Sequence, residues 1–274
     1  AVAHSVSYDF TATKIASNSP KEHFRDRWPD LVTLPGHFRQ HGYYTGFTGK
    51  IFHGGAEDAR SWDEDGNLRK VPAKGPRPPG RGLGRAPGES YPQWADNDGP
   101  RDFPEEFWPA FTRSRQLVQM LREGRDKPFF LALGFKEPHA PLVAPPKYFA
   151  RYPLEKIALP PSFVLKLADW KERPAPVRSL NPELFSLREL SSPEQARRAI
   201  QAYYASISFL DEMTGYVLDA LDDLGIADRT TVVFVSDHGF HLGEHGLWSK
   251  WTLFEEATRV PFIICAPGIK PGVS

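Results

Sequence analysis

Segments with helical periodicity alternate along this chain with short apolar runs, which restricts the folds it can adopt. Helical spacing is found over residues 34–41, 112–123 and 193–224, and strand-like runs over residues 43–48, 129–134, 230–235 and 260–265. Buried parallel strands read as continuous apolar runs, and the helices between them cover both faces of the sheet. We therefore predict an α/β fold with a mainly parallel, buried sheet flanked by helices on both faces.

The helix that begins after Ser192 carries the strongest local signal. Ser192 is a typical N-cap, Pro193 suits the first helical position and Gln195 the third, while Gly225 suits the end of a helix. Apolar residues between them recur every three or four positions. This pattern predicts a long amphipathic helix with one buried face.

Proline and glycine interrupt the regular segments. The chain has 27 Pro and 22 Gly, and residues 71–100 alone contain seven Pro and six Gly, a density at which neither helices nor sheet ladders persist. We predict a long irregular insertion over residues 56–105 within a single domain that spans residues 1–274. The arginines of this insertion could face an anionic ligand, although a solvated loop is the commoner explanation. Residues 138–193 are predicted to be an extended region with short helices at most.

The charge balance excludes several classes of partner. The 34 Lys and Arg residues balance 34 Asp and Glu residues, so we expect no nucleic acid partner, and any site for a charged ligand must be local. No apolar run approaches the roughly 20 residues of a transmembrane helix, so no membrane span is expected. The single cysteine, Cys265, excludes an intrachain disulfide framework.

Two clusters of ionisable residues follow predicted strands, where parallel sheets gather functional groups. Lys50 and His53 lie among glycines in the first, and His139 lies between Pro138 and Pro141 in the second. The prolines stiffen the chain around His139, which suits a donor held toward an anion. An ordinary surface loop explains the first cluster as well, and a structural histidine explains the second.

A third cluster, residues 236–250, is denser in functional groups than a core loop needs to be. Asp237 ends a predicted buried strand, where an ionised carboxylate is costly unless a cation or a donor is present, so a hard metal ion is its natural partner. His241 and His245 have the i, i+4 spacing of a helical zinc site, but Gly243 between them argues against such a helix.

With these motifs in order, the chain resembles the type I sulfatases of the alkaline phosphatase superfamily, within the branch that includes iduronate-2-sulfatase. The resemblance is carried by Ser-Asp-His-Gly, Leu-Gly-Glu-His-Gly and Trp-Ser-Lys within residues 236–250, by Gly-Lys-x-x-His at residues 49–53, by Pro-His-x-Pro at residues 138–141 and by the helical segment at residues 203–211. The matches run from about Asp9 to Pro267, which is nearly the whole chain.

The resemblance implies hydrolysis of a sulfate ester by a formylglycine nucleophile, formed from a cysteine that is absent from this chain, beside a divalent cation. The cation is expected to be Ca²⁺, with Mg²⁺ as the alternative. The implied substrate is a sulfated small molecule or glycan, the implied partner is the formylglycine-generating enzyme, and the implied location is periplasmic or extracellular. Residue by residue, Asp237 and His238 fall on metal positions, Lys50, His139 and Lys250 on positions that hold the sulfate and leaving oxygens, and His53 on the position that assists the hydrated aldehyde.

The chain also departs from the family pattern. The segment at residues 265–269 has Ile where the motif Cys-x-Pro-x-Arg requires Arg, and it lies at the wrong end, so we interpret Cys265 as structural. The paired aspartates of the metal site are absent before Asp9. We therefore expect a chain that begins after the nucleophile segment and ends before the C-terminal part of the family. Glu137 stands where members often have Lys, which weakens any contact with an acidic sugar.

Two alternative functions remain open. One is a non-catalytic relative that keeps Lys50, His139 and Lys250 and binds sulfated glycans. The other is a phosphodiester or phosphonate ester hydrolase on the same scaffold, because tetrahedral anions alone do not separate these cases.

Overall fold

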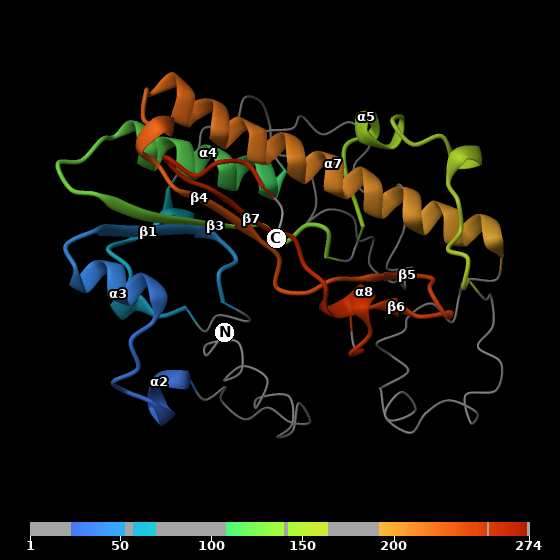
Figure 1. Cartoon of the computed structure of the whole chain (residues 1–274), viewed down its shortest axis with the longest axis horizontal. Coiled ribbons are helices and arrows are strands. Elements are labelled where there is room, and N and C mark those ends of the chain that lie inside the picture. The colour runs from blue at the N-terminus through green and yellow to red at the C-terminus, as the bar shows by residue number, and fades with distance from the viewer. Residues whose placement is uncertain are drawn as a thin grey trace. The chain divides into compact units, whose positions relative to one another are not determined.

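The structure, a computed structural model, describes residues 23–52, 57–69, 108–139, 142–163, 192–250 and 252–272. The chain divides into two compact units, whose elements are labelled in Figure 1. Unit 1 contains Ala1–Pro72 and Pro109–Lys136, and unit 2 contains Ala73–Trp108 and Glu137–Ser274. Within the described ranges, no helix combines the length and the apolar character needed to cross a bilayer.

Unit 1 is built around a parallel sheet with the strand order β2-β1-β3. β1 pairs with β3 along its whole length, from Tyr44 opposite Phe129 to Gly49 opposite Gly134. The carboxyl ends of both strands therefore meet at one edge of the sheet. The elements of this unit are α2 (Phe24–Arg27), α3 (Leu34–Gln40), β1 (Tyr44–Gly49), η1 (Ala59–Ser61), β2 (Glu64–Asp65), η2 (Gly66–Leu68), α4 (Pro109–Arg122) and β3 (Phe129–Gly134).

Helices cover both faces of this sheet, as Figure 1 shows for α3 and α4. On one face, Phe38 of α3 stacks on Phe130 with ring centroids 4.6 Å apart. On the other, the hydroxyl of Thr48 donates to the side-chain oxygen of Gln116 in α4 at 2.8 Å. Phe130 pairs with Thr45, three residues before Thr48, so Phe130 and Thr48 project from opposite faces. The predicted covering of the sheet on both faces is confirmed for unit 1.

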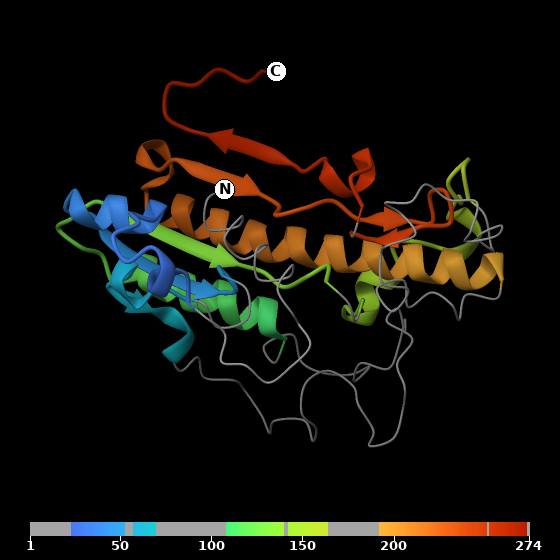
Figure 2. The same cartoon turned by 90° about the horizontal axis from the view of Figure 1, so that it is seen from below.

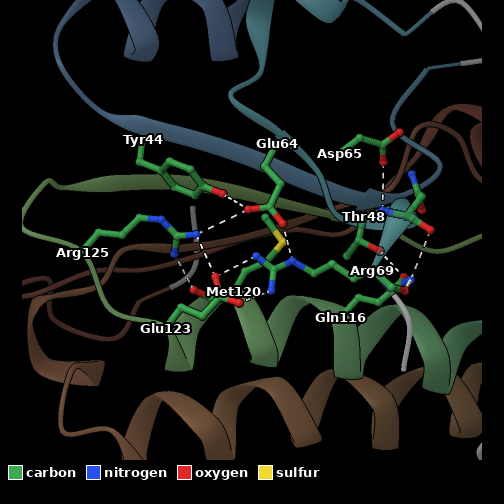
Figure 3. A network of polar contacts seen from close by, with 10 residues as sticks. Tyr44, Thr48, Glu64, Asp65, Arg69, Gln116, Met120, Glu123 and Arg125 are labelled. Atoms are coloured by element: carbon green, nitrogen blue, oxygen red, sulfur yellow. Dashed lines mark hydrogen bonds and ion pairs between the residues drawn. The ribbon is translucent and has the colours of Figure 1, made fainter. Parts of the chain in front are cut away.

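A network of ionic contacts joins β2 and α4 to β1 (Figure 3). Arg69 pairs with Glu64 and Glu123, and Arg125 contacts the same two carboxylates at 3.4 and 3.1 Å. The hydroxyl of Tyr44 donates to Glu64, and the Arg125 guanidinium carbon lies 3.7 Å from the centre of the Tyr44 ring. Hydrogen bonds from Arg69 hold the pKa values of Glu64 and Glu123 below their usual range. Burial and the bond to Glu64 raise the pKa of Tyr44 to about 12.

The first part of the predicted insertion over residues 56–105 contains short regular elements. Residues 57–69 contain η1, β2 and η2, and β2 pairs with β1 through Gly46–Glu64 and Phe47–Asp65. A strand of two residues is too short for an apolar alternation to be visible in the sequence. Residues 70–107 lie outside the described part of the chain.

Unit 2 contains one long helix and several short elements. The short helices α5 and η4 lie in the region that was predicted to be extended, which confirms the prediction for its described residues. The elements are α5 (Pro146–Phe149), η4 (Leu154–Lys156), α7 (Pro193–Asp223), η8 (Ala227–Arg229), β4 (Val232–Val235), β5 (His241–Leu242), β6 (Trp248–Ser249), α8 (Glu255–Thr258) and β7 (Phe262–Cys265).

Helix α7 begins and ends at the residues that the sequence predicts. The hydroxyl of Ser192 accepts the N–H of Gln195 at 3.2 Å, and Gly225 follows the helix with a φ of +62°. In the middle of α7, the fully buried Phe209 packs against Tyr148 with ring centroids 5.2 Å apart. Its first turns contribute to a core cluster made of Ile157, Ala196, Ala199, Ile200 and Trp248.

The strands β4 and β7 depart from the prediction in direction and in burial. They pair antiparallel, with Val233 opposite Ile264 and Val235 opposite Phe262, and Figure 2 shows them side by side. These four side chains share one face and are 47% to 65% exposed. The prediction of two buried strands is therefore wrong, because an apolar run predicts a strand but not what packs against it. Cys265, expected to be buried, is exposed at the end of β7.

Candidate functional site

Lys50 is held at the carboxyl end of β1 by the close approach of β3. Its N–H donates to the carbonyl oxygen of Gly134 at 2.8 Å. A Cβ on Gly134 would lie 1.8 Å from the Lys50 oxygen, and a Cβ on Gly49 would lie 1.9 Å from the Gly134 oxygen. Gly49 also has a φ of +82°, which residues with a Cβ rarely adopt. Both glycines are therefore required to place Lys50 at this edge.

A half-buried carboxylate fixes the loop that follows Lys50. Glu57 accepts the N–H of Phe52 at 3.1 Å. Burial raises the pKa of Glu57 above its usual range, although backbone donors oppose this shift. Glu57 is not predicted from the sequence, because a single glutamate in a loop carries no pattern. The other residue expected in this loop, His53, lies outside the described residues.

His139 lies in unit 2, where it follows the cis peptide bond between Glu137 and Pro138. Its side chain is exposed, while Glu137 and Pro138 are half-buried. The sequence predicts that prolines stiffen the chain around His139. On its N-terminal side the stiffening residue is Pro138, which is itself half-buried.

Asp237 and His238 follow β4 and face each other. His238 Nε2 lies 3.5 Å from Asp237 Oδ1, and His238 Nδ1 lies 2.7 Å from the carbonyl oxygen of Gly239. A carbonyl oxygen only accepts, so Nδ1 carries a proton and Nε2 is the nitrogen that faces the carboxylate. A carboxylate oxygen and an imidazole nitrogen are both groups that bind divalent cations. The pair therefore has the chemistry of metal ligands.

These two side chains make only part of a metal site. Ca²⁺ and Mg²⁺ prefer oxygen ligands, and an imidazole nitrogen beside a carboxylate is compatible with several divalent cations. Across the described ranges, no group of three or more His, Cys, Asp or Glu side chains is placed to hold a metal ion. Asp237 and His238 therefore fit such an ion as two ligands of a larger set.

Lys250 follows a short hairpin. β5 pairs antiparallel with β6, which places His241 opposite Ser249 and Leu242 opposite Trp248. Trp248 belongs to the core cluster at the start of α7. Ser249 has a φ of +66°, in the left-handed region. The residue before Lys250 therefore has a backbone conformation that is uncommon for a residue with a Cβ.

The burial of His241 and its contact in this hairpin were not predicted from the sequence. It is fully buried, and its Nε2 lies 2.6 Å from Thr252 Oγ1. Burial lowers the pKa of His241, so its ring is neutral at neutral pH. His245 is exposed in the turn after β5, so the two histidines do not share a helix and the argument against a helical zinc site is confirmed.

The predicted residues are thus distributed over both units. Lys50 lies in unit 1, whereas His139, Asp237, His238 and Lys250 lie in unit 2. Within unit 2 the structure brings Asp237 and His238 into contact.

Comparisons with known proteins extend over most of the chain. The family model described as Sulfatase matches residues 7–274. A sulfatase of Formosa agariphila is 35% identical over 249 residues, which cover 89% of this chain and 48% of that protein. Iduronate 2-sulfatase of Mus musculus is 35% identical over 255 residues, which cover 87% of this chain and 46% of that protein. The chain therefore spans about half the length of these curated relatives.

A solved structure shows the same fold. Phosphonate monoester hydrolase of Agrobacterium radiobacter superposes with a TM-score of 0.70 at 17% sequence identity, covering 86% of this chain and 53% of that one. At this identity the likeness concerns the α/β architecture alone.

Proposed function

The chain belongs to the sulfatase family, and from this membership we propose that the whole protein hydrolyses sulfate esters. The observation that carries the proposal is the Asp237–His238 pair after β4, where a carboxylate oxygen and an imidazole nitrogen face each other at 3.5 Å within the matched region. We further propose that residues 1–274 belong to one sulfatase catalytic domain.

Asp237 and His238 supply two ligands of a divalent cation, which we expect to be Ca²⁺, with Mg²⁺ as the alternative. When bound, such a cation contributes positive charge beside the sulfate oxygens. His238 keeps its ring in place by donating from Nδ1 to the carbonyl of Gly239. This second contact orients Nε2 toward the carboxylate of Asp237.

Lys50, His139 and Lys250 contact the sulfate group in this proposal. A lysine ammonium is a compact positive charge suited to oxygens that gain negative charge in the transition state. His139 donates a hydrogen bond and serves as the acid for the leaving oxygen. His53 assists the nucleophile, a formylglycine made by the formylglycine-generating enzyme from a cysteine outside these residues, which supplies the covalent step.

We infer a sulfated sugar as the substrate class. Iduronate 2-sulfatase is among the relatives at 35% identity, and its name specifies a sugar sulfate. A phosphate or phosphonate ester is the competing class, because the solved phosphonate monoester hydrolase has the same fold. A sulfate monoester carries one negative charge where a phosphate monoester carries nearly two, so matched aryl esters separate the classes.

The test uses the full-length protein, produced together with a formylglycine-generating enzyme and assayed on matched aryl sulfate, phosphate and phosphonate esters. We expect the sulfate to be hydrolysed fastest, EDTA to abolish turnover, and Ca²⁺ or Mg²⁺ to restore it. Asp237→Asn is expected to lower kcat/KM by about 100-fold or more, since it removes a charged ligand. Asp228→Asn, at an exposed position in η8 before β4, is the matched control and is expected to leave kcat/KM unchanged.

Two results would contradict the proposal. Faster turnover of the phosphate or phosphonate ester would assign the other ester class. Binding of a sulfated oligosaccharide without turnover of any ester, and with loss of binding in Lys250→Ala, would assign a binding protein.

A further inference from the structure

His241 contacts the chain on both sides of Lys250. In the β5–β6 pairing it stands opposite Ser249, the residue before Lys250. Its Nε2 also lies 2.6 Å from the hydroxyl of Thr252, two residues after Lys250. His241 is therefore linked to the chain on both sides of a single lysine, by its backbone pairing with Ser249 and by its side-chain contact with Thr252.

The contact between His241 and Thr252 joins a fully buried ring to a half-buried hydroxyl. Thr252 Oγ1 also accepts the N–H of Phe254 at 3.3 Å, so the hydroxyl that meets the ring is itself attached to the backbone. His241 Nδ1 lies 4.0 Å from Glu244 Oε2, which is beyond hydrogen-bond distance. Among the described residues, the ring is therefore held through its Nε2.

The backbone before Lys250 shows why such a hold is needed. Ser249 has a φ of +66°, a conformation that a residue with a Cβ keeps only where its surroundings impose it. Trp248, one residue earlier, is fixed in the core cluster with Ile157 and the first turns of α7. The bond from His241 to Thr252 adds an anchor on the far side of Lys250, so the chain is held at both ends of the strained position.

We propose that His241 is a positioning residue for Lys250, which its side chain holds through Thr252, beside the backbone pairing with Ser249, in the conformation that presents the ammonium to the sulfate group. The inference rests on the proposed function in one respect, the assignment of Lys250 as a sulfate contact. His241 itself is buried and acts through Lys250 rather than on the substrate.

The first test is a double-mutant cycle in the full-length, matured protein, with 4-methylumbelliferyl sulfate as the probe. His241→Leu is expected to lower kcat/KM by about 10- to 100-fold, the usual effect of a misplaced group. In a Lys250→Ala background the same change is expected to alter kcat/KM by less than about twofold, because the two residues act as one unit. His241→Gln, whose amide can still pair with Thr252, is expected to retain most of the activity. An equal loss in both backgrounds would overturn the inference.

The second test needs no turnover. Limited digestion with trypsin, followed by mass spectrometry, measures cleavage after Lys250 relative to cleavage after the exposed Arg151 of the same chain. His241→Leu and Thr252→Val are expected to raise this ratio about tenfold by releasing the segment, whereas His241→Gln and Thr252→Ser leave it near the parent value. An unchanged ratio in His241→Leu would refute positioning. A raised ratio in a protein that hydrolyses no ester would support positioning while the proposed function fails.

Discussion

Arg69 and Arg125 both contact Glu64 and Glu123, and the hydrogen bonds from Arg69 lower the pKa values of these carboxyls most. The lowered pKa values of these carboxylates mean that their charged forms are stabilised by folding. That stabilisation is present above the unfolded pKa of glutamate, about 4.3, and is lost as the pH falls through the lower folded pKa values.

We therefore expect Arg69→Met to lower the free energy of unfolding at pH 7 by about 1–2 kcal/mol, a value reduced for the half-exposed Glu123. Below pH 3 the parent and the variant are expected to differ much less. Urea unfolding at both pH values measures this difference, and Arg122→Met, at an exposed position beside Glu123, is the matched control. A pH-independent loss would mean that the packing of the Arg69 side chain matters more than its charge.

Individual site residues differ in how far the sequence reveals them. Lys50, Asp237 and Lys250 stand in motifs, where several functional groups lie within a few positions of one another. The partnership of His241 with Thr252 joins residues eleven positions apart across a hairpin. No periodicity marks such a pair, because it depends on the register of β5 against β6, which local sequence does not determine.

At the scale of elements, the carboxyl ends of β1 and β3 approach too closely for side chains at Gly49 and Gly134. Gly134→Ala is expected to destabilise the protein by about 3 kcal/mol or more, because the new Cβ would meet the backbone oxygen of Lys50, which cannot move without breaking the pairing. Gly215→Ala, within α7, meets nothing within 4 Å. It is expected to stabilise by about 0.5–1 kcal/mol through the better helix propensity of alanine. Chemical denaturation of both variants checks the contrast, and a mild effect at Gly134 would contradict it.

The elements that the sequence predicts best are those whose signals are local. The ends of α7 follow from Ser192 and Gly225, and β3 follows from an uninterrupted apolar run at residues 129–134. The two-residue strand β2 has no such signal. The antiparallel pairing of β4 with β7 was also not predictable, because an apolar run shows neither direction nor partner.

At the scale of the whole molecule, the strands β4 and β7 present an exposed apolar face. Exposed patches of this kind bind apolar dyes and promote association. Val233→Thr and Ile264→Thr are expected to reduce the fluorescence of bound anilinonaphthalene sulfonate while changing stability by less than about 0.5 kcal/mol. Val232→Thr, at a half-buried position on the other face, is the control and is expected to leave dye binding unchanged. Equal dye binding in all three variants would place the dye elsewhere.

Cys265 provides a single site for covalent labelling on this pair of strands. It is the single cysteine of the chain, it is exposed, and it lies opposite Val232 at the end of β7. A maleimide fluorophore or a spin label would therefore attach to these residues at one defined position. The rate of that labelling would report when another segment or molecule comes to cover β7. A cysteine unsuited to be the nucleophile thus becomes a reporter of assembly.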